Sequence, residues 1–191
     1  MSPLIRSLVA LAIVAGSASA QAPTQFCFPN TPGVINCPCN NPPLNLGQQG
    51  CDNFAFGNSG TGGASLVGFG NSSVMNDTLT LQVYNENPGV FTLLLESIHV
   101  NNGGITYGAG VRCVTAPIHR VYGHAGFRQN AGGMANWGNG TGDPSMAVDI
   151  GAVPGLTTFF QAWYRDPNAL NHCSNSATFN VSNAVVVSWN P

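Results

Sequence analysis

Short runs of alternating side chains, separated by clusters of turn-forming residues, are the feature that most constrains how this chain can fold. Residues 78–84 read Thr-Leu-Thr-Leu-Gln-Val-Tyr, which places Leu79, Leu81 and Val83 on one face of an extended segment. A period of two residues is typical of a half-buried β-strand. No segment combines a sustained 3.6-residue period with capping residues, so the sequence predicts an all-β fold.

Further strand-like runs follow along the chain. Residues 90–100 are apolar on both faces at their centre, as a central strand would be, and they follow the turn Glu86-Asn87-Pro88-Gly89. Pro117 interrupts the run 111–122, which is therefore either two strands or one edge strand. Additional strands are expected at residues 146–150, 157–164 and 184–189. We expect a turn at Asn101-Asn102-Gly103-Gly104 and a long loop over the Gly- and Asn-rich stretch 128–144.

About seven or eight short strands without an internal repeat favour an antiparallel β-sandwich, with jelly-roll or Greek-key connections. The sandwich is expected over residues 58–191, after a segment 21–57 that is rich in Pro, Asn, Gly and Cys. Because proline fixes φ and lacks a ladder donor, segment 21–57 predicts irregular backbone. Residues 1–20 have the features of a secretory signal peptide: Arg6, a short apolar run and Ala18-Ser19-Ala20. We therefore expect a protein that is secreted or held at the cell surface.

Six cysteines follow the expected cleavage site, and an even number in an exported chain indicates disulfides. They are Cys27, Cys37, Cys39, Cys51, Cys113 and Cys173. Four of them lie within residues 27–51, so the economical pairing has two bridges inside that cluster and one between Cys113 and Cys173. Sequence alone does not choose among the other connectivities. Zinc is disfavoured, because the paired cysteines of zinc ribbons are usually further apart than Cys37 and Cys39.

Charged residues are scarce, at 6% of the chain, and lysine is absent. The cations expected after signal removal are Arg112, Arg120, Arg128 and Arg165, against seven acidic residues. This composition offers no basic patch for nucleic acid and no polybasic stretch for an anionic membrane. We expect no nucleic-acid partner and no membrane insertion after signal removal.

Residue types that commonly catalyse hydrolysis form no recognisable pattern. The histidines are His99, His119, His124 and His172. They lack metal-binding spacing such as H-x-H. A Ser–His–Asp triad could use Ser145, but Pro144 precedes it where an oxyanion-binding loop needs backbone N–H groups, and no G-x-S-x-G motif is present. Glu86 and Glu96 are not singled out as a catalytic pair. We therefore predict no catalytic residue, metal or cofactor.

The candidate ligand surface consists of Trp137, Asp143, Arg165 and Asp166. Trp137 lies in the polar stretch 128–144, where an exposed indole could stack on a sugar, although packing onto the end of the sandwich is the more ordinary outcome. Asp143 and Asp149, with loop carbonyls, could hold calcium, but no D-x-D-x-D-G series is present. Arg165 and Asp166 end a strand-like run before Pro167, and an architectural clamp is favoured there over a ligand site.

Several motifs recur in one recognisable combination: Cys37-Pro38-Cys39-Asn40-Asn41, Gly50-Cys51-Asp52-Asn53, Gly110-Val111-Arg112-Cys113-Val114, Gln161-Ala162-Trp163-Tyr164-Arg165-Asp166-Pro167, and Phe179-Asn180-Val181-Ser182-Asn183-Ala184 leading to Trp189. Together they resemble a Cys-rich domain of unknown function that recurs in secreted planctomycete-type bacterial proteins. The resemblance covers essentially the whole chain after residue 20, and it implies export, disulfides and a β fold. Tyr107-Gly108-Ala109-Gly110 departs from that pattern, which usually has an acid before the last glycine.

Taken together, these features predict a secreted, non-enzymatic β-sandwich module with a binding or structural role. Its expected partner is a glycan or a cell-surface protein, contacted through the Gly/Asn-rich loops. The alternative is an extracellular hydrolase, directed at glycans or esters, whose site the sequence does not reveal.

Overall fold

The computed structural model describes residues 21–191, and the expected signal peptide 1–20 lies outside the described residues. The strands are β1 (Thr24–Phe26), β2 (Ser65–Phe69), β3 (Thr80–Tyr84), β4 (Phe91–Ser97), β5 (Val100–Tyr107), β6 (Gly110–Val114), β7 (His119–Arg120), β8 (Arg128–Gln129), β9 (Ala135–Gly138), β10 (Thr157–Arg165) and β11 (Phe179–Ser188). The helical turns are η1 (Gly123–Gly126), α1 (Met146–Asp149) and η2 (Pro167–Asn171).

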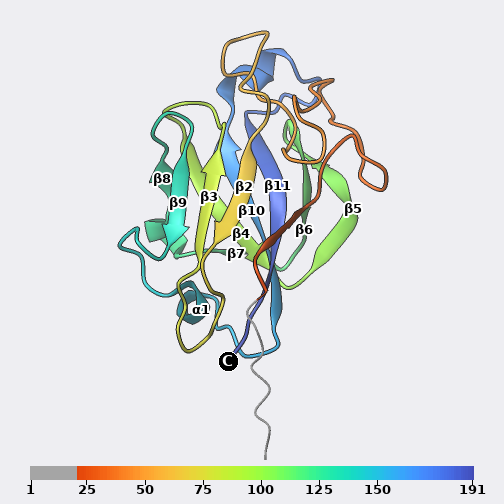
Figure 1. Cartoon of the computed structure of the whole chain (residues 1–191). Coiled ribbons are helices and arrows are strands. Elements are labelled where there is room, and N and C mark those ends of the chain that lie inside the picture. Colours follow the sequence, from red (N-terminus) through yellow and green to blue (C-terminus); the bar gives the residue numbers. More distant parts are fainter. Residues whose placement is uncertain (1–20) are drawn as a thin grey trace, which may run out of the picture.

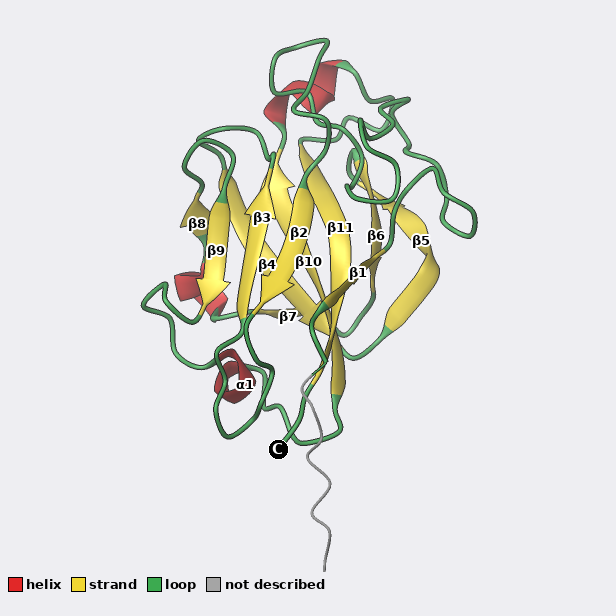
Figure 2. Cartoon of the chain, in the orientation of Figure 1, coloured by secondary structure: helices red, strands yellow, loops and turns green. Residues whose placement is uncertain are grey.

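Two sheets face each other and enclose the main core (Figure 1). The larger sheet has the order β1-β11-β10-β4-β7, and β8 pairs with another part of β4. The smaller sheet has the order β2-β3-β9. All of these strand pairings are antiparallel. The predicted all-β antiparallel sandwich is therefore confirmed, and Figure 2 shows how little of the chain is helical.

The core is built from the alternation that the sequence displays. Leu79, Leu81 and Val83 are fully buried and face the large sheet, where Leu94 and Phe160 are equally inaccessible. Burying a side chain of this size stabilises the fold by about 1.5–3 kcal/mol. β4 lies between β10 and β7 in the large sheet and carries apolar side chains on both faces, as predicted for a central strand. The outer face of the large sheet, opposite the main core, is covered only in part.

The β5–β6 hairpin covers one portion of that outer face. Val111 and Cys113 of β6 pack with Ala184 of β11 in a second apolar cluster. Gln161 of β10 joins the layers, because its buried amide donates to the Val111 and Ser182 carbonyls and accepts from Cys113 N at 3.0 Å. The rest of the outer face, over β4 and the end of β10, is left without this cover.

The disulfides differ from the expected pairing. The bridges are Cys27–Cys113, Cys37–Cys51 and Cys39–Cys173. The prediction of two bridges inside residues 27–51 and one Cys113–Cys173 bridge is therefore wrong. The reason is topological: segment 21–57 runs along the hairpin and over the end of the sandwich, which brings Cys27 beside β6 and Cys39 beside η2, and only Cys37 and Cys51 pair within the segment. The segment is irregular, as predicted, except for β1, which pairs with β11.

Three local predictions are also corrected. Residues 146–150, expected to be a strand, contain the helix α1, which Ser145 caps by accepting a hydrogen bond from Val148 N at 3.3 Å. The expected loop 128–144 contains β8 and β9, and β9 ends at Gly138, where φ is +99° and a Cβ would lie 2.2 Å from the Leu79 carbonyl oxygen. Asn101–Gly104, expected as a turn, lies inside β5. The interrupted run 111–122 resolves into two strands, β6 and β7.

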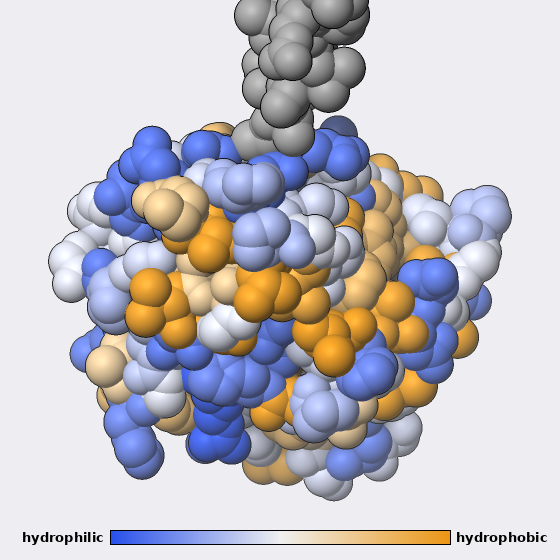
Figure 3. Space-filling model, turned by 90° about the horizontal axis from the view of Figure 1, so that it is seen from below, coloured by the Kyte–Doolittle hydropathy of each residue, from blue (hydrophilic) through white to orange (hydrophobic). Residues whose placement is uncertain are grey.

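The end of the sandwich that carries α1 and the C-terminus has an apolar patch surrounded by polar residues, seen from below in Figure 3. Exposed apolar side chains at this end include Met75, Ile98, Val148 and Val153. Within residues 21–191, no helix is long and apolar enough to cross a membrane.

Candidate functional site

The uncovered part of the large sheet's outer face is hollowed. Two adjoining hollows, of about 460 Å³ and 270 Å³, share Phe127 and Trp163 in their walls. We call the combined hollow the aromatic groove. It is lined by Phe91, Leu93, Leu95, Tyr107, Arg120, His124, Phe127, Trp163, Arg165 and Phe179.

Strand alternation places these side chains on one face. Leu94 of β4 and Ala162 and Tyr164 of β10 belong to the main core, so their neighbours in sequence point the opposite way. Leu93 and Trp163 are directly paired across β4 and β10 and form part of the groove. The groove is therefore built on the rigid centre of the sheet and not on a loop.

Aromatic rings contact one another along the groove. The ring centroids of Trp163 and Phe179 lie 5.7 Å apart, and those of Phe179 and Tyr107 lie 4.9 Å apart in an edge-to-face arrangement. Phe91 and Phe127 add rings that are 57% and 37% exposed. Such packing holds the rings in fixed orientations while leaving part of their surface open to solvent.

Cations surround the same rings. Arg120 and Arg165 line the groove, and the Cζ atom of Arg112 lies 4.2 Å from the centroid of the Tyr107 ring. Arg165 donates to Thr178 Oγ1 at 3.4 Å, whereas the Nε atom of Arg112 is buried without a hydrogen-bond partner. Among the residues that the structure describes, no Asp or Glu lines either hollow.

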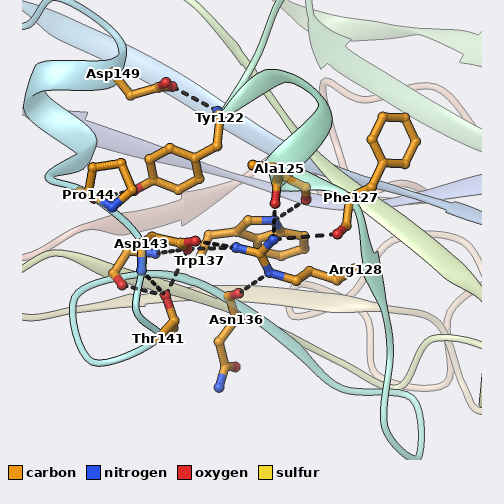
Figure 4. Close-up of polar contacts among 12 residues, drawn as sticks. Tyr122, Ala125, Phe127, Arg128, Asn136, Trp137, Thr141, Asp143, Pro144 and Asp149 are labelled. Atoms are coloured by element: carbon orange, nitrogen blue, oxygen red, sulfur yellow. Dashed lines mark hydrogen bonds and ion pairs between the residues drawn. The ribbon is translucent and has the colours of Figure 1, made fainter.

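Trp137, the expected sugar platform, is fully buried. Its Nε1 donates to the Gly126 carbonyl at 2.8 Å, inside the loop that Figure 4 shows. The indole is inaccessible to a ligand, so the prediction of Trp137 as a binding surface is wrong. It packs in the main core, which is the alternative that the sequence also left open.

Asp143 is engaged by its own loop (Figure 4). Arg128 Nη2 donates to its two carboxylate oxygens at 2.5 and 2.7 Å, while Gly138 N and the Thr141 hydroxyl donate at 3.0 and 2.7 Å. Partial burial acts to raise the pKa of Asp143, but these hydrogen bonds and the Arg128 charge lower it overall. This arrangement uses the carboxylate to fix the loop between β9 and α1.

Arg165 and Asp166 point in different directions. Arg165 is exposed and lines the aromatic groove, whereas Asp166 is fully buried. Asp166 accepts from Phe54 N at 3.2 Å and from Asn87 Nδ2 at 2.9 Å, and burial raises its pKa. Asp166 therefore links the N-terminal segment to the end of β10, as the favoured architectural role predicts. Arg165 instead lines the aromatic groove.

A second cluster of ionisable groups lies at the end of the molecule that carries α1. His119 Nε2 is 3.0 Å from Asp149 Oδ2, which also accepts from Tyr122 N at 2.9 Å. Glu96 is paired with His119 across β4 and β7, and burial raises its pKa, with Asp149 adding to the rise and His119 opposing it. Glu96 and His119 line a hollow of about 280 Å³ with Ile98, Pro117 and other apolar residues.

Ser145, considered for a triad, has its hydroxyl occupied by local hydrogen bonds. Its hydroxyl donates to Asp77 Oδ2 at 2.8 Å and accepts from Val148 N, so it fixes the start of α1. Within residues 21–191, no group of three or more His, Cys, Asp or Glu side chains is arranged to hold a metal ion.

Sequence reasoning missed most of the aromatic groove. Phe91, Tyr107, Phe127 and Phe179 come from separate strands or loops, and only the strand order brings them together. One indication was available: residues 157–164 are aromatic on both faces, which requires an apolar environment on each side of β10.

Comparison of the chain with protein-family models, with curated proteins and with solved structures gave no match. The resemblance to the planctomycete-type domain therefore stays a prediction. The three disulfides do indicate an oxidising environment, because such bridges persist outside reducing compartments.

Proposed function

We propose that this protein is an exported glycan-binding module that holds a polysaccharide chain in the aromatic groove. The observation that carries the proposal is the row Trp163–Phe179–Tyr107, with Phe91 and Phe127 beside it, on an open sheet face. The C–H faces of pyranose rings are apolar and stack on aromatic side chains, while guanidinium groups donate hydrogen bonds to hydroxyl oxygens.

The shape of the site supports a polymer as the ligand. Two adjoining hollows that share Phe127 and Trp163 make an elongated site rather than one closed pocket. Disulfides and the signal-peptide features of residues 1–20 support an extracellular setting, where polysaccharides are abundant ligands. The lining offers stacking surfaces and hydrogen-bond donors, which suit binding without chemistry.

A pair of exposed phenylalanines provides a matched test. Phe91 is 57% exposed and lies in the groove, whereas Phe69 is 51% exposed on β2 of the other sheet. We expect Phe91→Ala to weaken binding to soluble or insoluble polysaccharides about tenfold, the value of one stacking contact of about 1.4 kcal/mol. Phe69→Ala should leave binding unchanged. Affinity electrophoresis over a panel of polysaccharides measures both, and equal effects of the two variants would contradict the proposal.

Hydrolysis is the second candidate function, and the cluster Glu96–His119–Asp149 is the observation in its favour. A carboxyl group with a raised pKa can act as a general acid, and a His–Asp pair can act as a base. The test is release of 4-nitrophenol from nitrophenyl esters and glycosides by the protein and by Glu96→Gln. Absence of hydrolysis, or hydrolysis that survives the substitution, would remove this candidate.

A further inference from the structure

We infer that the polysaccharide held by the aromatic groove is acidic, a chain of sugars that carry carboxylate groups. The inference rests on the proposed function and names its ligand class. It is carried by where the few cations of this chain lie.

Arg120 and Arg165 line the groove, and Arg112 lies against the ring of Tyr107, one of the lining residues. These are three of the four arginines in residues 21–191, although the chain has no lysine and more acidic than basic residues. The fourth, Arg128 of β8, pairs with Asp143 of the loop between β9 and α1 and does not line the groove. Three of the four arginine charges in residues 21–191 therefore lie at or beside the same surface.

The three arginines lack the anionic partner that Arg128 has. The ion pairs formed by the described residues are Arg128–Asp143 and His119–Asp149, and neither includes a groove arginine. Because the groove lining also lacks Asp and Glu among the described residues, the anion that would balance these guanidinium groups has to come from outside.

Arg112 lies beside the groove, against Tyr107. Its guanidinium lies over the Tyr107 ring, and its Nε is buried with no hydrogen-bond partner. A planar carboxylate suits an arginine better than a hydroxyl does, because it accepts two parallel hydrogen bonds from one guanidinium.

The positions of the arginines suit a polymer with spaced charges. Strands β7 and β10 flank β4. On the β7 side, Arg120 pairs with Leu95 of β4. On the β10 side, Tyr164 pairs with Thr92 of β4, and Arg165 follows Tyr164. Arg165 is one residue further along and so level with Phe91, four residues of β4 or about 13 Å from the level of Arg120, with Trp163 between the two levels. Rings that stack on the aromatic residues would alternate with carboxylates that reach the arginines. A densely charged polymer such as nucleic acid fits less well, because the surrounding chain is acidic.

The test compares carboxylated polymers with their neutral forms. The oxidised, exported protein is titrated by isothermal calorimetry with polygalacturonate, alginate and hyaluronan, each alongside the same polymer with its carboxyl groups reduced to alcohols. Xylan, mannan, dextran sulfate and single-stranded DNA complete the panel. We expect at least one carboxylated polymer to bind at least tenfold more tightly than its reduced form, with affinity that falls as salt is added.

Substitutions that remove one positive charge each then locate the effect. Arg120→Gln and Arg165→Gln should each weaken binding of the carboxylated polymer about tenfold and make it less sensitive to salt. Arg128→Gln changes the net charge equally but removes a cation outside the groove, so binding should be unchanged at a temperature where circular dichroism shows all variants folded.

The outcomes separate the two claims. Equal binding of a carboxylated polymer and its reduced form, or binding of neutral xylan or mannan alone, overturns the acidic ligand and leaves the glycan-binding function standing. Preference for dextran sulfate or single-stranded DNA over every carboxylated polymer also overturns the acidic-sugar inference. Binding of no polysaccharide overturns both claims.

Discussion

Glu86 should make the protein less stable as the pH rises, and its substitution by glutamine should remove that dependence. The side chain is fully buried, and burial raises its pKa from the ordinary value of 4.5 to about 8, although hydrogen bonds from Asn130 and Thr92 oppose the rise. The folded protein therefore keeps a proton on Glu86 that the unfolded chain has already lost. Between pH 4.5 and about 8, the contribution of Glu86 to the free energy of unfolding should fall by about 1.4 kcal/mol per pH unit, roughly 5 kcal/mol in all.

Glutamine is a suitable replacement because the surrounding hydrogen bonds can be kept. Asn130 Nδ2 donates to Glu86 Oε2 at 2.8 Å, and an amide oxygen can accept that bond. The Thr92 hydroxyl lies 2.7 Å from Glu86 Oε1 and can instead accept from the amide nitrogen, since the Trp163 carbonyl is available for its proton at 3.0 Å. The glutamine is neutral at every pH and carries no cost of ionisation in the interior.

The assay is urea unfolding of wild type and Glu86→Gln, followed by tryptophan fluorescence with the disulfides intact, from pH 4 to pH 9. Other acidic groups whose pKa is raised, such as Glu96 and Asp166, are present in both proteins and cancel in the difference. The difference between the two unfolding free energies should shift by about 5 kcal/mol in favour of the variant across this range. Parallel pH profiles would refute the reasoning.

Two further predictions concern stability. Asp143→Asn should lower the unfolding free energy at pH 7 by about 1–3 kcal/mol, because it removes the charge that Arg128 and the loop donors stabilise. Since the pKa of Asp143 is lowered, this loss should be present above its ordinary value of 3.8 and should fade as the pH falls through the folded-state pKa, which urea unfolding at several pH values measures. Removing the Cys39–Cys173 bridge with two serines should cost about 5 kcal/mol, against about 3 kcal/mol for Cys37–Cys51, because it spans 134 rather than 14 positions. Thermal unfolding ranks the two variants, and the opposite ranking would argue against a chain-entropy origin.

The sequence predicts the sandwich well where local pattern and tertiary environment agree. Leu79, Leu81 and Val83 alternate with residues of the opposite face, and all three are buried. The central strand β4 was recognised because both of its faces carry apolar side chains. In such segments, the hydrophobic period records which face lies against the core.

Short strands and helices depend on tertiary contacts that the local sequence pattern does not reveal. β8 has two residues and exists through its pairing with β4, and α1 has four residues, too few to display a helical period. The disulfide pairing follows the path of segment 21–57 over the sandwich, which no cysteine spacing reveals. The aromatic groove escaped prediction for the same reason: Arg120 and Trp163 meet across β4 only once the strand order is fixed.

The disulfide connectivity also sets an order of events for a chain made from its N-terminus. Cys37 and Cys51 can pair early, but Cys27 has to wait for Cys113, and Cys39 has to wait until residue 173 has emerged. Any bridge that these early thiols form with each other in the meantime must be undone by thiol–disulfide exchange before the native pairs can close. Oxidation too rapid for exchange would trap the chain with its first cysteines mispaired. Segment 21–57 can therefore be fixed completely only after residue 173 has been synthesised, although its Cys37–Cys51 bridge can form early.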